Sequence, residues 1–307
     1  MAYLHSDREQ FRDAIDLAYE QTGVMVQVIE KDYYVTMLLR LLAQKMPYIV
    51  FKGGTSLSKC HKVIRRFSED IDISIDTLLS QGQKKKIKQA IVDSAQELGM
   101  TIENLDETRS RRDYNRYVIA YDSVIPMASD ALKAAVLLET SYTAVSFPTV
   151  LLPVHSYIGD MMEQEAPDAI EEYNLNPFEM KVQGIDRTLA DKVFAVCDYY
   201  LQGKVAKHSR HLYDIYKLLP LVPQNENFRE LVKEVRAVRA QSVVCPSALP
   251  EADVPELLEK IIKEKAYKQD YDSLTTQLLE ENMPYDTVIA ALKQIADGAM
   301  FDNTYGG

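Results

Sequence analysis

The sequence Phe51-Lys52-Gly53-Gly54-Thr55-Ser56-Leu57-Ser58 is followed shortly by Arg66-Phe67-Ser68-Glu69-Asp70-Ile71-Asp72-Ile73-Ser74-Ile75. This pattern predicts a strand over 48–51, a glycine turn, a short helix, and a second strand that carries Asp70 and Asp72. Because successive side chains of a strand alternate between its faces, we expect both carboxylates on one face and the isoleucines on the other. The two runs therefore predict paired negative charge on one side of a buried sheet.

Asp70 and Asp72 are candidate metal ligands. Two carboxylates held a few ångströms apart repel each other unless a cation lies between them, and Mg²⁺ prefers oxygen ligands. The alternative is a solvated strand edge, but acidic residues are depleted in strands with isoleucine neighbours. Ser68 shares their face, as a phosphate ligand or as an ordinary serine at a strand entry. Glu69 faces the other way and is predicted to be structural.

The glycines upstream predict a phosphate site. Gly53 and Gly54 allow backbone N–H groups to approach an anion closely, and the helix that follows directs its positive end to the same place. Thr55 and Ser56 belong to the same predicted cradle. A phosphate cradle beside a paired-carboxylate metal site is typical of phosphoryl or nucleotidyl transfer.

The amino-acid composition indicates which binding partners to expect. The 307-residue chain has a net charge of −11, which disfavours phosphate contacts along a nucleic acid. Its basic residues are nevertheless grouped. The lysine run is best explained as a solvated helix face, whereas the two later groups are candidates for nucleic-acid or triphosphate contacts. The groups are Lys84, Lys85, Lys86 and Lys88; Arg109, Arg111, Arg112 and Arg116; and Lys204, Lys207, His208, Arg210 and His211.

Cysteine use and hydropathy narrow the class of protein. Cys60, Cys197 and Cys245 are odd in number and widely spaced, so neither a disulfide framework nor a zinc site is expected. The first residues lack the apolar segment of a signal peptide, and no run approaches the roughly 18 apolar residues of a membrane span. A cytoplasmic protein without a membrane partner is predicted.

The hydrophobic pattern changes from mixed to helical along the chain. We predict an α+β domain over residues 1–185 and a helical domain over 186–307. Four prolines between 148 and 177 predict an irregular segment before the last strand, and Gly203 is expected at a helix C-terminus. The remaining predicted strands lie at 100–122, as two strands, 133–145 and 178–182. The main predicted helices cover 26–45, 77–98, 187–203, 209–219, 225–240, 254–280, as a broken helix, and 284–299.

These motifs resemble those of the AbiEii/AbiGii toxin family, whose members are nucleotidyltransferases of the DNA polymerase β superfamily found in bacterial toxin–antitoxin and phage-defence systems. The resemblance covers roughly the first 220 residues. It implies a polymerase-β-type nucleotidyltransferase mixed sheet flanked by helices, followed by an all-helical C-terminal domain that closes over the nucleotide. The matching segments are Ile29–Val35, Gly53–Lys59, Arg66–Asp72, Thr188–Lys192 and Arg210–Tyr216.

The resemblance also implies further site residues. Glu139, the one charge in the strand Ala-Val-Leu-Leu-Glu-Thr-Ser, is the candidate third carboxylate, although a charge pair within the sheet is the alternative. Lys192 is expected to contact the triphosphate, and Asp214 to pair with Lys192 or to orient a basic group. An interdomain salt bridge is the alternative for both. Residues 30–32 match the front helix of the family, where a packing role is expected.

The resulting hypothesis is transfer of a nucleoside monophosphate from an NTP to an acceptor hydroxyl with two Mg²⁺ ions. Asp70, Asp72 and Glu139 would hold the ions. By resemblance, the acceptor would be an RNA, with the tRNA 3′ end the leading choice, and a cognate antitoxin would restrain the toxin. A small-molecule or protein hydroxyl is the alternative acceptor, which the acidic net charge favours. A non-catalytic nucleotide-binding module is a further alternative.

Overall fold

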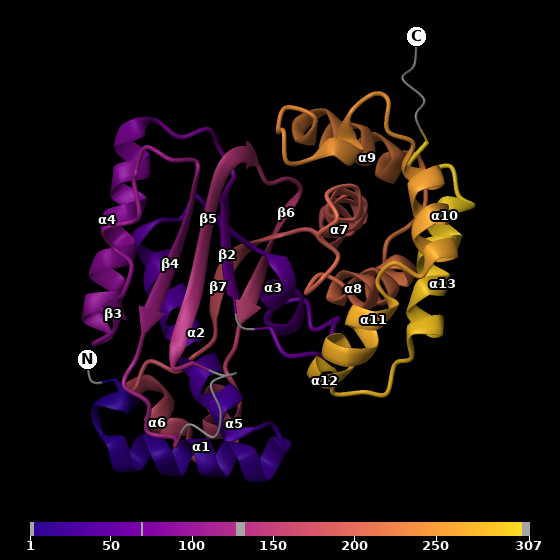
Figure 1. The fold of residues 1–307 in the computed structure, drawn as a ribbon. Coiled ribbons are helices and arrows are strands. Elements are labelled where there is room, and N and C mark those ends of the chain that lie inside the picture. Colours follow the sequence, from indigo (N-terminus) through magenta and orange to yellow (C-terminus); the bar gives the residue numbers. More distant parts are fainter. Residues whose placement is uncertain (1–2, 69, 127–132, 303–307) are drawn as a thin grey trace. The chain divides into compact units, whose positions relative to one another are not determined.

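The computed structural model describes residues 3–68, 70–126 and 133–302, so Glu69 lies outside the described residues. The chain forms two compact units (Figure 1). The first comprises Met1–His61 and Ser68–Gln183, and the second comprises Lys62–Phe67 and Gly184–Gly307. The second unit thus resumes beside the expected boundary at residue 185. It also includes the segment 62–67, which the sequence pattern places in the first domain.

A seven-stranded mixed sheet forms the centre of the first unit. Its strand order is β3-β4-β5-β2-β1-β7-β6. β2 is parallel to β5 and β1 is parallel to β7, whereas the other neighbours are antiparallel. The strands are β1 (Ile49–Lys52), β2 (Asp70–Ile75), β3 (Thr101–Ile102), β4 (Tyr114–Ala120), β5 (Ala135–Val145), β6 (Thr149–Val154) and β7 (Phe178–Gln183).

One face of this sheet is apolar. Phe51, Ile71, Ile73 and Leu138 project from three adjacent strands and are almost completely buried. They share one hydrophobic core with α2 (Val26–Lys45) and α4 (Gln81–Glu97). Full burial of such a side chain stabilises the fold by roughly 1.5–3 kcal/mol, so the register of the strands is fixed by the need to keep this face inside.

The other helices of the first unit pack on α2, pack on α5 or follow β1. α1 (Arg8–Thr22) packs on both α2 and α5 (Tyr157–Glu165), and α6 (Pro167–Glu172) packs on α5. The short helix α3 (Gly53–Lys59) starts directly after β1 and contacts β1 and β2. This helix is where the sequence predicts the phosphate cradle.

The second unit is helical, and α7 (Ile185–Leu201) contacts α8, α9 and α10. Gly203 follows the end of α7 with a φ of +66°, the left-handed conformation that the sequence predicts for a helix C-terminus. None of the helices in the described part of the chain is both long and apolar enough to cross a membrane. The remaining α-helices are α8 (Arg210–Leu218), α9 (Glu226–Arg239), α10 (Val254–Glu264), α11 (Lys268–Asp270), α12 (Thr276–Leu278) and α13 (Tyr285–Ala296).

The proline-containing segment differs from its prediction, because it forms β6, α5 and α6 instead of irregular structure. Pro153 is tolerated in β6 because this strand lies at the edge of the sheet. Pro167 occupies the first position of α6, where a helix does not need the missing N–H. The prolines therefore mark an edge strand and a helix start, which are the two places where regular structure accepts them.

Candidate active site

Strand β2 carries the predicted pair of carboxylates. Asp70 and Asp72 are partly exposed, whereas Ile71 and Ile73 are buried. The two carboxylates therefore lie on one face of the sheet, opposite the apolar core, as strand alternation predicts. Any chemistry they perform takes place on this face.

A line of four charged residues crosses this face. Strand register places Lys52 of β1 and Glu139 of β5 opposite Asp72, one on each side, and Arg116 of β4 opposite Glu139. Directly opposed residues project to the same face, and neighbouring strands lie about 4.8 Å apart. The order of charges is positive, negative, negative, positive. We call Lys52, Asp72, Glu139 and Arg116 the charged row.

Glu139 is held by its neighbours on β4. Its Oε1 lies 3.6 Å from Nε of Arg116, and the two side chains are 32% and 52% exposed. Tyr114 hydrogen-bonds to the same carboxylate, and burial followed by the negative charge of Glu139 raises the pKa of Tyr114. The carboxylate therefore makes the sheet charge pair that the sequence left open as an alternative, and it does so beside Asp72.

Gly53 makes room for Asp72. Its φ of +80° is in the left-handed region, and a Cβ built on it would lie 1.9 Å from Oδ2 of Asp72. No side chain larger than hydrogen fits there while Asp72 keeps its position. The glycine is required by the carboxylate as well as by the backbone turn.

Replacement of Gly53 by Ala tests this contact. We expect Gly53→Ala to lower the free energy of unfolding by about 1–2 kcal/mol through backbone strain. We also expect it to reduce nucleotide transfer by about tenfold or more, because the new methyl group would displace the carboxylate of Asp72, a predicted metal ligand. Thermal melts and a labelled-nucleotide transfer assay measure the two effects.

Gly99→Ala is the matched control. Gly99 has a φ of +65° but no atom within 4 Å of a built Cβ, so it imposes similar strain without a clash. Equal transfer per folded molecule in the two variants would show that the contact between Gly53 and Asp72 is irrelevant to activity.

The hydroxyl groups of the predicted cradle bond to one another and to backbone. The Thr55 hydroxyl lies 2.9 Å from that of Ser68 on the β2 side. The Ser56 hydroxyl is buried and donates to the Gly53 carbonyl at 2.9 Å. Ser56 thus stabilises the turn with its side chain, and a phosphate contact at Ser56 would fall to the backbone. Thr55 and Ser68 tie α3 to the segment that enters β2.

An ion pair with α2 holds the C-terminal end of α3 in place. Lys59, at the end of α3, pairs with Asp32 of α2 and donates to the His155 carbonyl at 2.7 Å. The second oxygen of Asp32 accepts from the Tyr157 N–H at 3.0 Å. Glu30, on the same helix, accepts from the Val124 N–H at 2.7 Å. Asp32 therefore positions the end of α3, whereas Glu30 holds the segment that follows β4.

In the second unit, Lys192 and Asp214 form a buried ion pair at 2.6 Å. Arg66, from the segment 62–67, adds two parallel hydrogen bonds to the same carboxylate, at 2.7 and 2.8 Å. Asp214 is fully buried between these two cations. A bidentate arginine bond is among the strongest charge pairings in proteins, so it explains why 62–67 belongs to the helical unit.

This buried cluster perturbs its own ionisation. Burial alone would raise the pKa of Asp214, but the charges of Arg66 and Lys192 overcome it and hold the pKa below its ordinary value. Burial lowers the pKa of Lys192, which Asp214 opposes. Burial, and then the adjacent Lys192, lowers the pKa of His211 well below its usual range. His211 is therefore neutral at physiological pH, with its Nδ1 3.5 Å from Nζ of Lys192.

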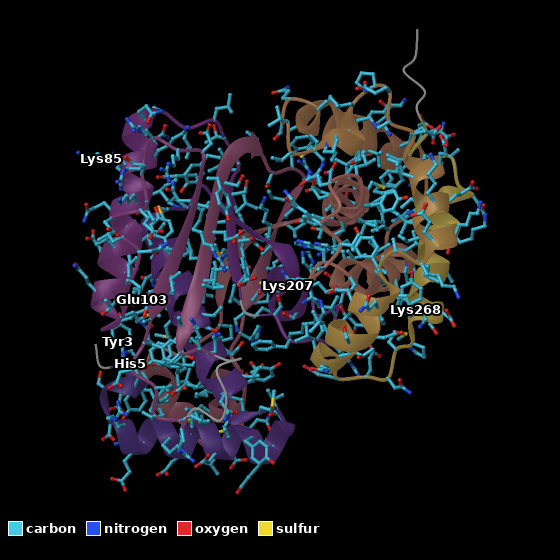
Figure 2. All side chains as sticks on the ribbon, in the orientation of Figure 1. Tyr3, His5, Lys85, Glu103, Lys207 and Lys268 are labelled. Carbon is cyan, nitrogen blue, oxygen red and sulfur yellow. The ribbon has the colours of Figure 1, made fainter. Side chains whose placement is uncertain are left out.

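Within the three basic groups, some side chains are held by ion pairs or hydrogen bonds and others are exposed to solvent. Lys84 pairs with Asp113, and Lys88 donates to the Thr108 carbonyl, so half of the lysine run holds the loop before β4. Lys85, by contrast, projects from the outer side of α4 (Figure 2). The exposed members are Lys85, Lys86, Arg109, Arg111, Arg112, Arg116, Lys204 and Lys207.

Three rings stack in the second unit, and two of them, His208 and His211, belong to the third basic group. Tyr199 lies parallel to His208, with ring centroids 3.5 Å apart, and parallel to His211 at 5.8 Å. Lys207, labelled in Figure 2, is in the turn between α7 and α8, which Asp270 fixes by accepting from its N–H at 2.7 Å. The turn therefore carries two exposed cations, Lys204 and Lys207, close in the chain to the stacked ring of His208.

The carboxylate face has the donor set of a hard divalent cation. Asp70 and Asp72 supply two carboxylates, Glu139 a third in register, and Gly53 leaves the space that Asp72 occupies. Within residues 3–68, 70–126 and 133–302, no group of three or more acidic, histidine or cysteine side chains is already gathered around a metal position. Glu139 is drawn toward Arg116 instead.

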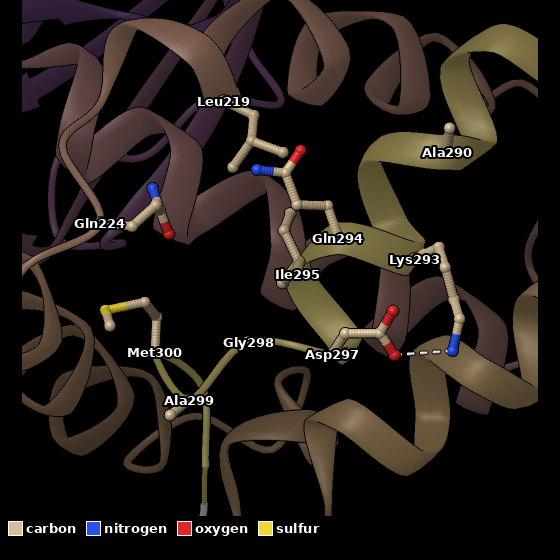
Figure 3. A pocket seen from close by; sticks show the side chains of 10 residues that line it. All are labelled: Leu219, Gln224, Ala290, Lys293, Gln294, Ile295, Asp297, Gly298, Ala299 and Met300. Atoms are coloured by element: carbon tan, nitrogen blue, oxygen red, sulfur yellow. Dashed lines mark hydrogen bonds and ion pairs between the residues drawn. The ribbon is translucent and has the colours of Figure 1, made fainter.

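A separate hollow lies in the second unit. It has a volume of about 560 Å³ and is lined by residues around the end of α13 (Figure 3). Its two charged lining residues, Lys293 and Asp297, pair with each other at 2.6 Å. None of the residues that line this pocket is a predicted site residue, so we do not propose it as the catalytic site.

The structure brings three residues into the charged row or the buried ion-pair cluster that the sequence did not place there. Lys52 has no predicted role, although it is a lone charge after three apolar strand residues. Arg66 belongs to a matching motif, but only its buried position identifies its part in the cluster. The sequence groups Arg116 with the basic loop before β4, whereas the strand pairing places it on the charged row.

One family profile matches most of the chain. The family profile described as nucleotidyl transferase AbiEii toxin, type IV TA system, matches residues 36–294. No curated protein matches the chain. A similar solved structure is MenT4, a nucleotidyltransferase toxin from Mycobacterium tuberculosis H37Rv, with a TM-score of 0.51 and 15% identity over 94% of this chain and 89% of that one. This likeness confirms the predicted fold class, and the family match, which covers most of the chain, shows that this protein belongs to the AbiEii nucleotidyltransferase toxin family.

Proposed function

We propose that this nucleotidyltransferase moves a nucleoside monophosphate from an NTP to a hydroxyl of an RNA, with the tRNA 3′ end as the leading acceptor. The observation that carries the proposal is the carboxylate face of the sheet, where Asp72 lies between Gly53 and Glu139 and shares its face with Asp70. The protein would act as a toxin restrained by a cognate antitoxin, in keeping with its family.

The carboxylates are assigned to two Mg²⁺ ions. Asp70 and Asp72 would hold both, and Glu139 would complete the set for the ion nearest the acceptor. When bound, such ions supply Lewis acidity that activates the acceptor hydroxyl and neutralises charge on the departing pyrophosphate. The strand register puts the three carboxylates on one face, and Glu139 would have to turn from Arg116 to join the other two.

The phosphate contacts are assigned to the start of α3 and to the helical unit. Gly53 and Gly54 lack side chains that would block the backbone, and Thr55, Ser56 and Ser68 hold the turn in shape. Lys192 would place positive charge on the triphosphate. Asp214 would orient Lys192, while Arg66 supplies the second cation that keeps Asp214 ionised.

A direct assay tests the reaction. The protein is incubated with each of the four labelled NTPs, total RNA and Mg²⁺ or Mn²⁺, and the label in RNA is measured. We expect one or two of the NTPs to label a small RNA at its 3′ end. If total RNA stays unlabelled with every NTP and either metal, the acceptor is a small molecule or a protein.

The salt dependence of labelling tests the RNA interaction. Removing one cation that binds an RNA phosphate should reduce the slope of log affinity against log salt by about 0.7 for a single strand. Replacing Arg111 and Arg112 by Gln, or Lys204 and Lys207 by Gln, should therefore flatten the slope and slow RNA labelling. NTP binding should be unchanged.

The double replacement of Lys85 and Lys86 by Gln is the control. It removes the same charge from the outer side of α4, where the lysines are exposed and a solvated role is predicted. If all three double variants shift the slope equally, the effect reflects net charge and not a defined RNA surface.

The second candidate is transfer to a small molecule or a protein hydroxyl. The net charge of −11 favours it, because an acidic protein repels RNA. A non-catalytic module is less consistent with the complete set of carboxylates, Gly53 and Lys192. The labelling assay separates the RNA hypothesis from both alternatives, since only that hypothesis predicts labelled RNA.

A further inference from the structure

Arg116 occupies the place on the charged row where a cation would stabilise Glu139. Its Nε lies 3.6 Å from Oε1 of Glu139, and Glu139 is opposite Asp72 in the strand register. Two adjacent carboxylates repel each other, and a guanidinium on the far side of one of them reduces that repulsion. In the absence of a metal, the positive charge of Arg116 therefore offsets part of the negative charge of Glu139, as a divalent cation would.

Arg116 and a cation would then compete for the same carboxylate. Glu139 turned toward Arg116 is not gathered with Asp70 and Asp72, in agreement with the absence of any assembled three-ligand group among the described side chains. A positive charge so close to the ligands also repels an incoming ion. Both effects weaken the binding of a free cation.

Arg116 is also suited to bind phosphate. Its side chain is 52% exposed and lies on the face that carries the carboxylates and Lys52. A planar guanidinium matches the oxygens of a phosphate in a bidentate manner, which an ammonium does not. When a triphosphate arrives, Arg116 has an alternative anionic partner, and Glu139 becomes available to the metal.

We propose that Arg116 couples cation binding to nucleotide binding: it opposes the binding of a free divalent cation and favours that of a metal–triphosphate complex. This proposal rests on the assignment of Asp72 and Glu139 as metal ligands. It predicts effects of opposite sign on the two binding events when Arg116 is removed. A residue that only stabilises the sheet would weaken both or neither.

Calorimetric titration with Mn²⁺ alone, and then with preformed Mn²⁺–tripolyphosphate, tests the coupling in Arg116→Gln. We expect Mn²⁺ alone to bind about three- to tenfold more tightly, the range set by removing an exposed ion pair and one like charge near the ion. We expect the tripolyphosphate complex to bind about threefold more weakly or worse. Unchanged or weakened binding of Mn²⁺ alone, or unchanged binding of the complex, would overturn the proposal.

Three further variants make the result specific. Lys85→Gln removes an equal charge from the exposed side of α4 and should leave both affinities near those of the wild type. In a Glu139→Gln background, Arg116→Gln should have much less effect on Mn²⁺ alone, because the competition acts through Glu139. If Asp72→Asn still binds Mn²⁺ like the wild type, the metal assignment itself is wrong, and this outcome differs from a failure confined to Arg116.

Discussion

Asp70→Asn and Asp72→Asn are each expected to reduce nucleotide transfer by at least about 100-fold while the protein stays folded. Each change removes a charged oxygen from the proposed metal site, which would have to balance the charge of divalent cations. Even groups that only support metal ligands typically matter by 10–100-fold. The fold should survive because both side chains are on the partly exposed face and because removing one of several adjacent like charges lowers their repulsion.

The labelled-NTP assay, run beside thermal melts on the same preparation, measures both quantities. Asp93→Asn is the control, since it removes an exposed carboxylate from α4, which packs on the apolar face of the sheet, opposite the charged row. Full transfer activity in either test variant would rule out the two-metal hypothesis. A melting temperature that falls together with activity would instead indicate a structural role for the carboxylate.

Asp214→Asn is expected to destabilise the helical unit by about 3–5 kcal/mol, the usual effect of leaving a buried charge without its partner. Arg66 and Lys192 would both remain buried, with only a neutral amide between them. The corresponding fall in melting temperature is on the order of 10 °C. Asp272→Asn is the matched control, because its ion pair with Lys268 is exposed and pairs of this kind contribute roughly 0–1 kcal/mol.

The pH dependence of this difference has a defined sign. The pKa of Asp214 is lower in the folded protein than in the unfolded chain. Its contribution is therefore complete above the ordinary carboxyl pKa of about 4 and is lost as the pH falls below it. The stability gap between the wild type and Asp214→Asn should narrow on acidification from about pH 5. A gap that stays constant or widens would show that the carboxylate does not gain its charge stabilisation from Arg66 and Lys192.

Local pattern predicted most of the fold. The helix over 26–45 has the predicted bounds, and the strands that carry Asp70, Asp72 and Glu139 form where alternation and β-branched residues indicate them. The family resemblance is confirmed by the profile match, and the fold class by the likeness to MenT4. The failures were β6, α5 and α6, because prolines were interpreted as breaks without knowledge of which strand lies at the edge.

The site was harder to predict than the fold. The motif around Asp70 and Asp72 is local, so the sequence alone places both carboxylates on one face. The charged row is not local: Lys52, Arg116 and Glu139 come from three strands, and only the order and register of the sheet bring them to one line. The same applies to Arg66 and Asp214, which are 148 positions apart in the chain. Among these residues, the variants of Arg116, Glu139 and Asp214 described above test the predicted roles.

The segment 62–67 has a consequence for how this protein can be divided. The chain passes from one unit to the other after His61, after Phe67 and after Gln183. An expression fragment that starts at Gly184 would contain Asp214 and Lys192 but would lack Arg66, together with the backbone bonds that Arg65 and Phe67 make to residues 278–280. The helical unit is therefore a compact body in space without being a continuous stretch of the gene, so it is not an exchangeable cassette, and swapping it between relatives would require transferring two separate pieces of coding sequence.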